Sequence, residues 1–223
     1  MTPLKLRVLG TDEMLTVTPA RLVVAGYTAR DEAVVAAHIA ELAAIGVPPP
    51  ATVPAFYDLD PALLTTDAVA AVSGPATSGE VEPVIVRHAG RYYLAVGSDH
   101  TDRELERVDI AASKAACAKP LGDSVVHLGP DLSTVEWDGL AADSSVDGWP
   151  YQRGSVATLR HPADLVARMT AALGPVDRDL VLFCGTLPLL TGEFTPGAYW
   201  RVHLELPAGP VLTHAYETKT RNP

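Results

Sequence analysis

Cysteine is scarce in this sequence, and its scarcity excludes a disulfide framework. The chain of 223 residues has two cysteines, Cys117 and Cys184, which are far apart and form no Cys-x-x-Cys pair. Small secreted domains held by disulfides carry many more cysteines at close spacing. We therefore expect two reduced, buried cysteines.

Basic residues are also few. The chain has 17 Lys+Arg against 27 Asp+Glu, which gives a formal net charge of -10. Such a surface repels phosphate backbones and is poorly suited to an anionic membrane surface. We expect neither a nucleic-acid partner nor a membrane partner.

Long apolar runs are absent. No window approaches the roughly 18 uninterrupted apolar residues of a membrane span. The first 17 residues have no continuous apolar region after a basic start and no small-residue cleavage site, so a secretory signal is not expected. These absences together favour a cytoplasmic protein.

Apolar residues are nevertheless plentiful enough for a substantial core. About 48% of residues are hydrophobic and 20% are charged, and the length suits one large domain or a tight pair. A proline-rich segment at residues 46–54 separates two parts of the chain. We expect a small N-terminal part over residues 1–56 and a main domain over residues 57–223.

Two helices are expected. The clearer one covers residues 31–45, where apolar residues recur at helical spacing, Thr28 and Asp31 resemble a capping box, and Gly46 is a plausible stop. The second covers residues 162–173.

Strand patterns dominate after residue 80. Residues 81–87 and 91–97 flank His88-Ala89-Gly90 and predict a hairpin, and residues 179–184 predict a buried strand. A second hairpin is expected over residues 199–206 and 211–217. This order predicts a strand-rich α+β fold and not alternating βαβ units.

Three acidic residues are placed to converge. Glu80 and Glu82 are two residues apart on an expected strand, so both side chains lie on one face. The next strand ends at Gly97-Ser98-Asp99, and the hairpin returns Asp99 to the same end of the sheet. Three carboxylates around one point suit Mg²⁺, Mn²⁺ or Ca²⁺, whereas a single Glu-x-Glu is more often a solvated strand face.

At this point the chain resembles the fumarylacetoacetate hydrolase superfamily. Five of its motifs occur in order between about residues 22 and 217. They are Ala25-Gly-Tyr27 followed by His38-Ile-Ala-Glu41, then Glu80-Val-Glu82, Gly97-Ser-Asp-His-Thr-Asp-Arg103, Lys114 with Pro120-Leu-Gly122, and Gly185-Thr186.

Departures from the family pattern mark the chain as a divergent bacterial branch. His100-Thr-Asp-Arg103 stands where the family usually has Ser-Ala-Arg-Asp, and Lys114-Ala-Ala-Cys117 replaces Lys-Ser-Phe-Asp. We therefore expect this chain to share the family's metal site more closely than the family's substrate.

The resemblance implies a mixed β-sandwich roll with a few flanking helices, and one divalent metal held by Glu80, Glu82 and Asp99. It assigns Lys114 to holding negative charge on the substrate and Tyr27 to substrate binding. Arg103 would either orient a substrate carboxylate or brace the carboxylate ligands. Thr186 would present its hydroxyl to a carboxylate or simply shape a turn.

His38 and Glu41 resemble the family's lid dyad. A histidine oriented by a carboxylate can take a proton from water, which then attacks the substrate carbonyl. The alternative is a surface pair on a helix, since residues three apart are neighbours there.

The expected function is metal-dependent hydrolysis of a C–C bond in a β-diketo or acylpyruvate-type acid, through an enolate that the metal stabilises. Decarboxylation of a 2-oxo acid, or hydration or isomerisation of an unsaturated 2-oxo acid, are alternatives within the same site. A non-catalytic protein that binds a small molecule is the alternative from another class. The partner is then a small oxo acid, and the resemblance alone implies a homodimer.

Overall fold

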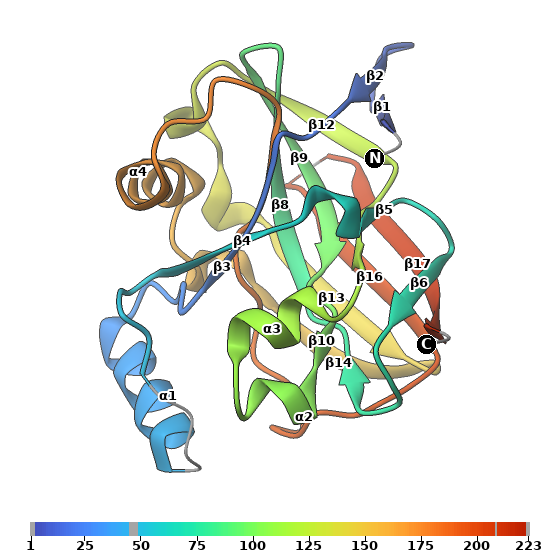
Figure 1. Cartoon of the computed structure of the whole chain (residues 1–223). Helices are drawn as coiled ribbons and strands as arrows, with labels where there is room; N and C mark the ends of the chain where they lie inside the picture. Colours follow the sequence, from blue (N-terminus) through green and yellow to red (C-terminus); the bar gives the residue numbers. More distant parts are fainter. Residues whose placement is uncertain (1–2, 45–48, 208, 222–223) are drawn as a thin grey trace.

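Two twisted β-sheets form the body of the protein, and four helices lie around them in the part of the chain that the structure describes (Figure 1). A computed structural model describes residues 3–44, 49–207 and 209–221, except for the side chains of His38, Glu41 and Leu42. The strand-rich α+β fold expected from the sequence is confirmed.

The larger sheet has eight strands and mixed polarity. Its strands, in spatial order, are β2 (Met14–Val17), β1 (Leu4–Val8), β12 (Ser124–Gly129), β9 (Arg91–Ser98), β8 (Val81–His88), β15 (Leu180–Phe183), β3 (Arg21–Gly26) and β4 (Ala55–Leu59). Most neighbours are antiparallel, but β1 pairs with β12 and β15 pairs with β3 in parallel.

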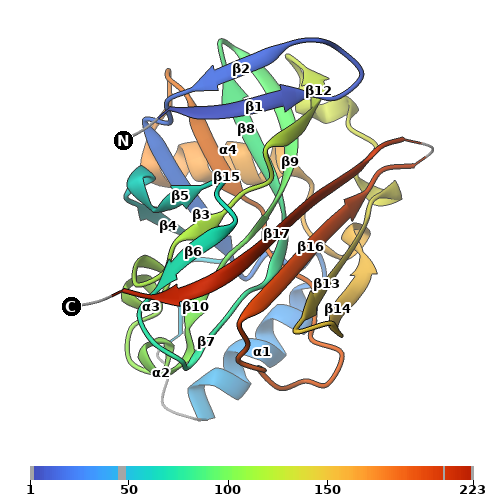
Figure 2. The same ribbon diagram turned by 90° about the vertical axis from the view of Figure 1, so that its right-hand side faces the viewer.

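The second sheet has five strands and packs beside the first (Figure 2). Its strands, in spatial order, are β14 (Trp149–Ser155), β13 (Ala141–Val146), β16 (Tyr199–Glu205), β17 (Val211–Thr220) and β6 (Val69–Val72). Two short ladders complete the pairing: β7 (Thr77–Ser78) with β10 (Thr101–Asp102), and β5 (Leu64–Thr65) with β11 (Lys119–Pro120).

The helices are α1 (Glu32–Ala44), α2 (Arg103–Glu106), α3 (Ile110–Ala115) and α4 (Pro162–Leu173). Single 3₁₀ turns occur at Pro61–Leu63, Leu132–Thr134, Trp137–Gly139 and Val156–Thr158. Within the described ranges, no helix is long and apolar enough to cross a membrane.

The central strand β8 is apolar because both of its faces are buried. Ile85 packs in the core between the two sheets, together with side chains of the five-stranded sheet and of α4. Its neighbours Val84 and Val86 pack in a second core on the opposite face, with residues of β1, β2 and β3. A strand covered on both sides reads as a continuous apolar run, which explains its sequence.

The expected elements agree with the structure to within a few residues. The hairpin turn is Ala89-Gly90, where both residues have positive φ (49° and 76°), as tight hairpins require. The capping box is wrong in one respect: Asp31 alone caps α1 by accepting from the Ala33 N–H, whereas Thr28 is buried. Gly46, the expected stop, lies outside the described residues.

The division at residues 56/57 stays a prediction. Strands β1, β2 and β3 of the expected N-terminal part belong to the same sheet as β8, β9 and β15.

Candidate active site

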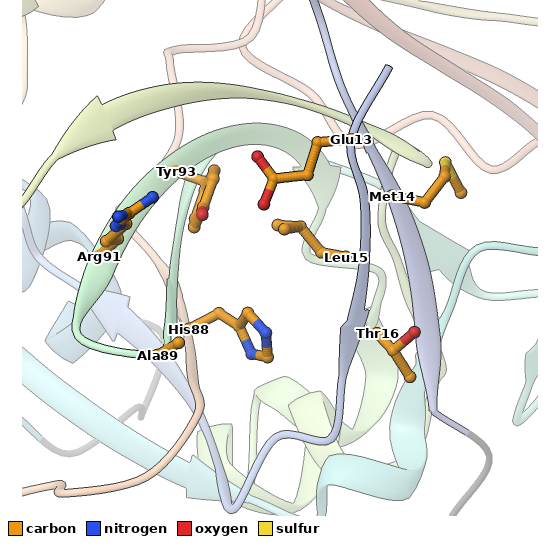
Figure 3. A pocket seen from close by; sticks show the side chains of 8 residues that line it. All are labelled: Glu13, Met14, Leu15, Thr16, His88, Ala89, Arg91 and Tyr93. Carbon is orange, nitrogen blue, oxygen red and sulfur yellow. The ribbon is translucent and has the colours of Figure 1, made fainter. Parts of the chain in front are cut away.

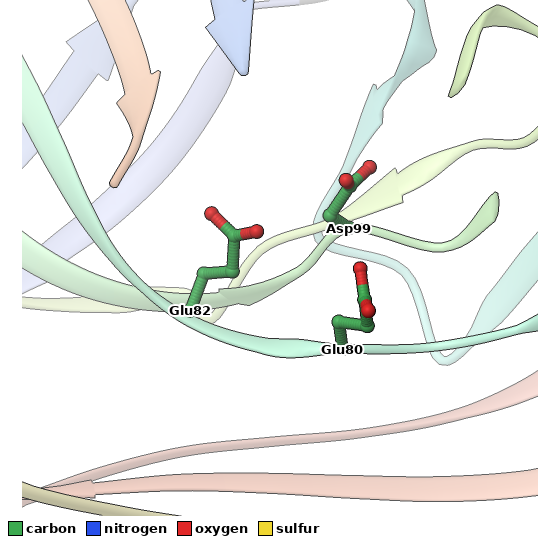
Figure 4. Close-up of side chains that lie close together, drawn as sticks. All are labelled: Glu80, Glu82 and Asp99. Atoms are coloured by element: carbon green, nitrogen blue, oxygen red, sulfur yellow. The ribbon is translucent and has the colours of Figure 1, made fainter. Parts of the chain in front are cut away.

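Three carboxylates meet at the open end of the β8–β9 hairpin. The hairpin pairs Val81 with Ser98, and the Asp99 N–H donates to the Glu80 carbonyl at 3.0 Å. One oxygen each from Glu80, Glu82 and Asp99 lies within 4.8 Å of the others. Figure 4 shows the side chains of Glu80, which directly precedes β8, and Glu82 pointing to the same side of the chain, with Asp99 beside Glu80. The structure thus brings together the three residues that the sequence predicted to converge.

These carboxylates are held where water has little access. Glu82 is 2% exposed and Asp99 is fully buried. Burial, together with the nearby Asp99 charge, raises the pKa of Glu82 well above its ordinary value. Burial also raises the pKa of Glu80, although Arg103 opposes the change. Such a group of like charges needs cations close by.

Two lysines supply positive charge to Asp99. The Lys114 ammonium bonds Asp99 Oδ2, and the Lys119 ammonium lies 3.0 Å from Asp99 Oδ1. Burial alone would raise the pKa of Asp99, but the two ammoniums outweigh it and lower the pKa below its usual range. Lys119 is fully buried and also donates to the His100 carbonyl at 2.6 Å.

Lys119 was not among the residues predicted from the sequence. The signal was present, since Lys119 is the one charged residue in the otherwise apolar stretch of residues 115–121. A lysine in such a stretch is rarely buried without a partner.

Arg103 braces the acidic cluster. Its guanidinium donates to Ser78 Oγ at 2.7 Å and to Glu106 at 2.9 Å, and it lies 3.3 Å from Glu80. The exposed Phe194 ring covers it, with the guanidinium carbon 3.8 Å from the ring centroid. These contacts fit the bracing role, and the orientation of a substrate carboxylate by Arg103 stays a prediction.

The Gly185-Thr186 turn holds Glu82. The Gly185 N–H donates to Glu82 Oε2 at 2.7 Å, and the Thr186 hydroxyl donates to the Val81 carbonyl at 2.9 Å. Gly185 has a φ of 101°, and a Cβ there would lie 1.7 Å from Thr28 Oγ1, so only glycine fits. Contact of Thr186 with a substrate stays a prediction.

Two tyrosines lie near Lys114. Its ammonium is 5.7 Å from the centroid of the Tyr57 ring, and burial raises the pKa of Tyr57 to about 12. Tyr27 follows β3 with a φ of 57°, and burial and the Glu106 charge raise its pKa. Tyr57 was not among the predicted residues, and no motif marks it. The role of Tyr27 in substrate binding stays a prediction.

His38 and Glu41 both lie in α1. Their side chains lie outside the described part of the chain, so the lid dyad stays a prediction.

The donor set fits a hard divalent cation. Carboxylate oxygens are the ligands that Mg²⁺, Mn²⁺ and Ca²⁺ prefer, and three of them converge here. Asp99 Oδ1 is buried and makes no well-aligned hydrogen bond, even with Lys119 nearby. A cation would satisfy that oxygen and offset the mutual repulsion of the carboxylates.

A surface hollow lies at the other end of the same hairpin (Figure 3). This cavity of about 460 Å³ lies between strand β2 and the β8–β9 turn. It is lined by Glu13, Met14, Leu15, Thr16, His88, Ala89, Arg91 and Tyr93. None of the carboxylates of the cluster reaches it.

Comparison with solved structures gives neighbours of one fold. Fumarylpyruvate hydrolase from Pseudomonas aeruginosa, in complex with Mn²⁺ and pyruvate, matches with a TM-score of 0.62 at 17% identity, over 99% of this chain and 97% of that one. The 5-carboxymethyl-2-hydroxymuconate delta-isomerase from Mycobacterium smegmatis matches with a TM-score of 0.61 at 15% identity, over 93% and 82%.

A third neighbour is 2-keto-3-deoxyarabinonate dehydratase, with a TM-score of 0.59 at 15% identity, over 96% of this chain and 79% of that one. At such identities the likeness establishes the fold and not the reaction. No curated protein matches the sequence.

The family comparison covers most of the chain. Residues 25–216 match the model of a family described as a protein of unknown function, DUF2848. The chain therefore belongs to the DUF2848 family, and its fold is that of the fumarylacetoacetate hydrolase superfamily, as the sequence motifs predicted.

Proposed function

We propose that this protein is a divalent-metal-dependent hydrolase that cleaves a C–C bond in a β-diketo or acylpyruvate-type acid. The observation that carries the proposal is the convergence of Glu80, Glu82 and Asp99 within 4.8 Å. Fumarylpyruvate hydrolase, a neighbour in fold, was solved with Mn²⁺ and pyruvate, which supports the choice of metal class and substrate class.

Glu80, Glu82 and Asp99 would hold the metal, with Mg²⁺, Mn²⁺ and Ca²⁺ as the candidates. When bound, a divalent cation supplies Lewis acidity for the negative charge that develops on substrate oxygens. The protein's own part is to orient these carboxylates. Arg103 braces Glu80, the Gly185 N–H holds Glu82, and two lysines favour the ionised form of Asp99.

Lys114 is the cation placed to meet the substrate. Lys119 is fully buried, and Arg103 is held by Ser78, Glu80 and Glu106. The Lys114 ammonium bonds Asp99 alone among the carboxylates of the cluster and faces the Tyr57 ring. An ammonium in such a site stabilises an oxyanion more strongly than it would in water. We assign Lys114 to the carboxylate or the developing enolate of the substrate.

Hydrolysis also needs a base for water. We propose that His38, oriented by Glu41, takes a proton from water, which adds to the distal carbonyl of the substrate. The C–C bond then breaks, and the carbon that leaves takes up a proton. A second candidate function is isomerisation or dehydration of an unsaturated or hydroxylated 2-oxo acid, or decarboxylation of a 2-oxo acid. The isomerase and the dehydratase among the structural neighbours favour the first two of these reactions.

Turnover of an acylpyruvate with and without Mn²⁺ tests the proposal. We expect activity that EDTA removes and Mn²⁺ restores, and Glu82→Ala should abolish it because the cluster loses a buried ligand. Glu13→Ala, at the distant hollow, is the matched control and should leave turnover unchanged. Full activity of Glu82→Ala would show that the metal assignment is wrong, and a folded wild type that binds Mn²⁺ without turnover would favour a binding protein.

The lid dyad is tested separately. His38→Ala should suppress hydrolysis of the acylpyruvate while sparing decarboxylation of oxaloacetate, because only hydrolysis needs a base for water. Equal loss of both activities would assign His38 to binding or folding.

We also propose a cytoplasmic homodimer that acts on a small oxo acid. The resemblance is the support for the dimer, and sedimentation equilibrium measures it directly.

A further inference from the structure

A chain of buried hydrogen bonds lies behind the carboxylate cluster, on the face of β9 opposite to Asp99. His100 is fully buried among aromatic rings, with Trp200 and Tyr216 in edge-on contact at centroid distances of 5.4 and 5.8 Å. Its two ring nitrogens contact Tyr216 Oη and Thr77 Oγ1, each at 3.0 Å. Burial, together with the nearby Lys119 and Arg103 charges, lowers the pKa of His100.

One direction of donation gives each hydroxyl of this hydrogen-bond chain both a donor and an acceptor. In that direction the Thr77 hydroxyl donates to the Gly74 carbonyl at 3.3 Å, Thr77 Oγ1 accepts from His100, and the imidazole carries its proton on Nε2. Nδ1 then accepts from the Tyr216 hydroxyl. With its hydrogen used, Tyr216 Oη accepts from Ser98 Oγ, 2.8 Å away.

This chain of hydrogen bonds ends at the backbone of the residues proposed as metal ligands. Ser98 Oγ accepts from the Glu80 N–H at 3.2 Å, and Ser98 and His100 are the two neighbours of Asp99. Gly79 leaves the space for this contact, because a Cβ there would lie 2.4 Å from Tyr216 Oη and 2.6 Å from Ser98 Oγ. The network therefore connects Tyr216 of β17 to Ser98 and His100, which flank Asp99, and through Ser98 to the backbone N–H of Glu80.

We infer that His100 is a positioning residue, held as the Nε2–H tautomer. It acts through Tyr216 and Ser98 to fix the backbone of Glu80 and Asp99. Its two ring nitrogens are used by Tyr216 and Thr77, so it acts on the carboxylates through their backbone. The inference rests on the proposed function insofar as those carboxylates bind a metal. Groups that orient metal ligands commonly contribute about 10-fold to 100-fold to metal affinity.

Tyr216→Phe removes the central hydroxyl of this hydrogen-bond chain and keeps the aromatic ring. We expect Mn²⁺ affinity, measured by calorimetry, to fall by about tenfold or more, and amide hydrogen exchange of Glu80 to quicken relative to the rest of β8. Ser98→Ala should give the same two results, and it is the second variant if Tyr216→Phe does not fold. Tyr93→Phe is the control, because Tyr93 is an equally buried tyrosine on β9 near the distant hollow.

The outcomes separate the two proposals. Unchanged Mn²⁺ affinity in folded Tyr216→Phe, with wild type binding Mn²⁺, would overturn the inference, as would a ¹⁵N spectrum with the His100 proton on Nδ1. If wild type binds no Mn²⁺, the proposed function fails. The amide hydrogen exchange rate of Glu80 is then the measurement that tests the inference. Faster exchange at Glu80 in Tyr216→Phe, but not in Tyr93→Phe, then supports it, and equal exchange overturns it.

Discussion

The two ends of the β8–β9 hairpin carry charged side chains in contrasting surroundings. At the open end, Glu82, Asp99 and Lys119 are almost or fully buried, and each has a named charged or polar partner. At the turn, Glu13 and Arg91 are exposed around a hollow of about 460 Å³. One hairpin thus has a packed charged cluster at one end and an open, solvated cavity at the other.

The contrast teaches that cavity size alone is a poor guide to chemistry in this fold. Charges in water interact weakly, whereas charges removed from water interact strongly and must be compensated. Only the open end of the hairpin shows strongly shifted pKa values with specific partners, which is the pattern of functional sites. Paired substitutions at the two ends test this contrast.

The largest effect on stability is expected at Lys119. Lys119→Met leaves Asp99 with one ammonium and the His100 carbonyl without its donor, so the free energy of unfolding should fall by about 3 kcal/mol or more. Arg91→Met, at the exposed end, should change it by less than about 0.5 kcal/mol. Urea unfolding of both variants measures the difference, and equal midpoints would remove the distinction between the two ends.

A smaller effect is expected from paired glycine substitutions. Gly90→Ala, with a φ of 76° and open space around it, should cost about 1–2 kcal/mol for the left-handed backbone. Gly185→Ala adds a clash with Thr28 and moves the N–H that holds Glu82, so it should cost about 1–3 kcal/mol more. Thermal unfolding and Mn²⁺ titration check the pair. Mn²⁺ affinity should fall in Gly185→Ala only, and a fall in both variants would contradict the assignment of Gly185 to the site.

The smallest effect is expected at His88. Its Nδ1 lies 2.9 Å from Asp179 Oδ2, but both side chains are partly exposed, at 25% and 20%. Surface ion pairs contribute about 0–1 kcal/mol, so His88→Ala should lower stability by no more than about 1 kcal/mol and leave turnover unchanged. A clear loss of turnover would mean that a change at the hollow alters the carboxylate cluster.

The sequence was sufficient to predict contacts between residues that are close together along the chain. The turn residues Ala89 and Gly90 and the alternation of side chains along each strand set the hairpin register, which places Asp99 against Glu80. These relations join residues fewer than 20 positions apart, so pattern rules could find them.

The sequence was insufficient where partners come from distant segments. Glu82 receives its hydrogen bond from Gly185, 103 residues away, and Ser98 meets Tyr216, 118 residues away. Thr28 looked like a helix cap because local rules ignore the tertiary contact that buries it beside Gly185. Strand pairing between remote segments decides such contacts, and no local pattern encodes it.

The position of β17 has a consequence for biosynthesis. A ribosome that has completed the β8–β9 hairpin has yet to make β15, the Gly185 turn and Tyr216, all of which enclose that hairpin. Folds dominated by such distant pairings form slowly, and their hydrophobic strands stay exposed while the chain emerges. The nascent hairpin must therefore keep its acidic end hydrated, and the site can close only after β17 has left the ribosome.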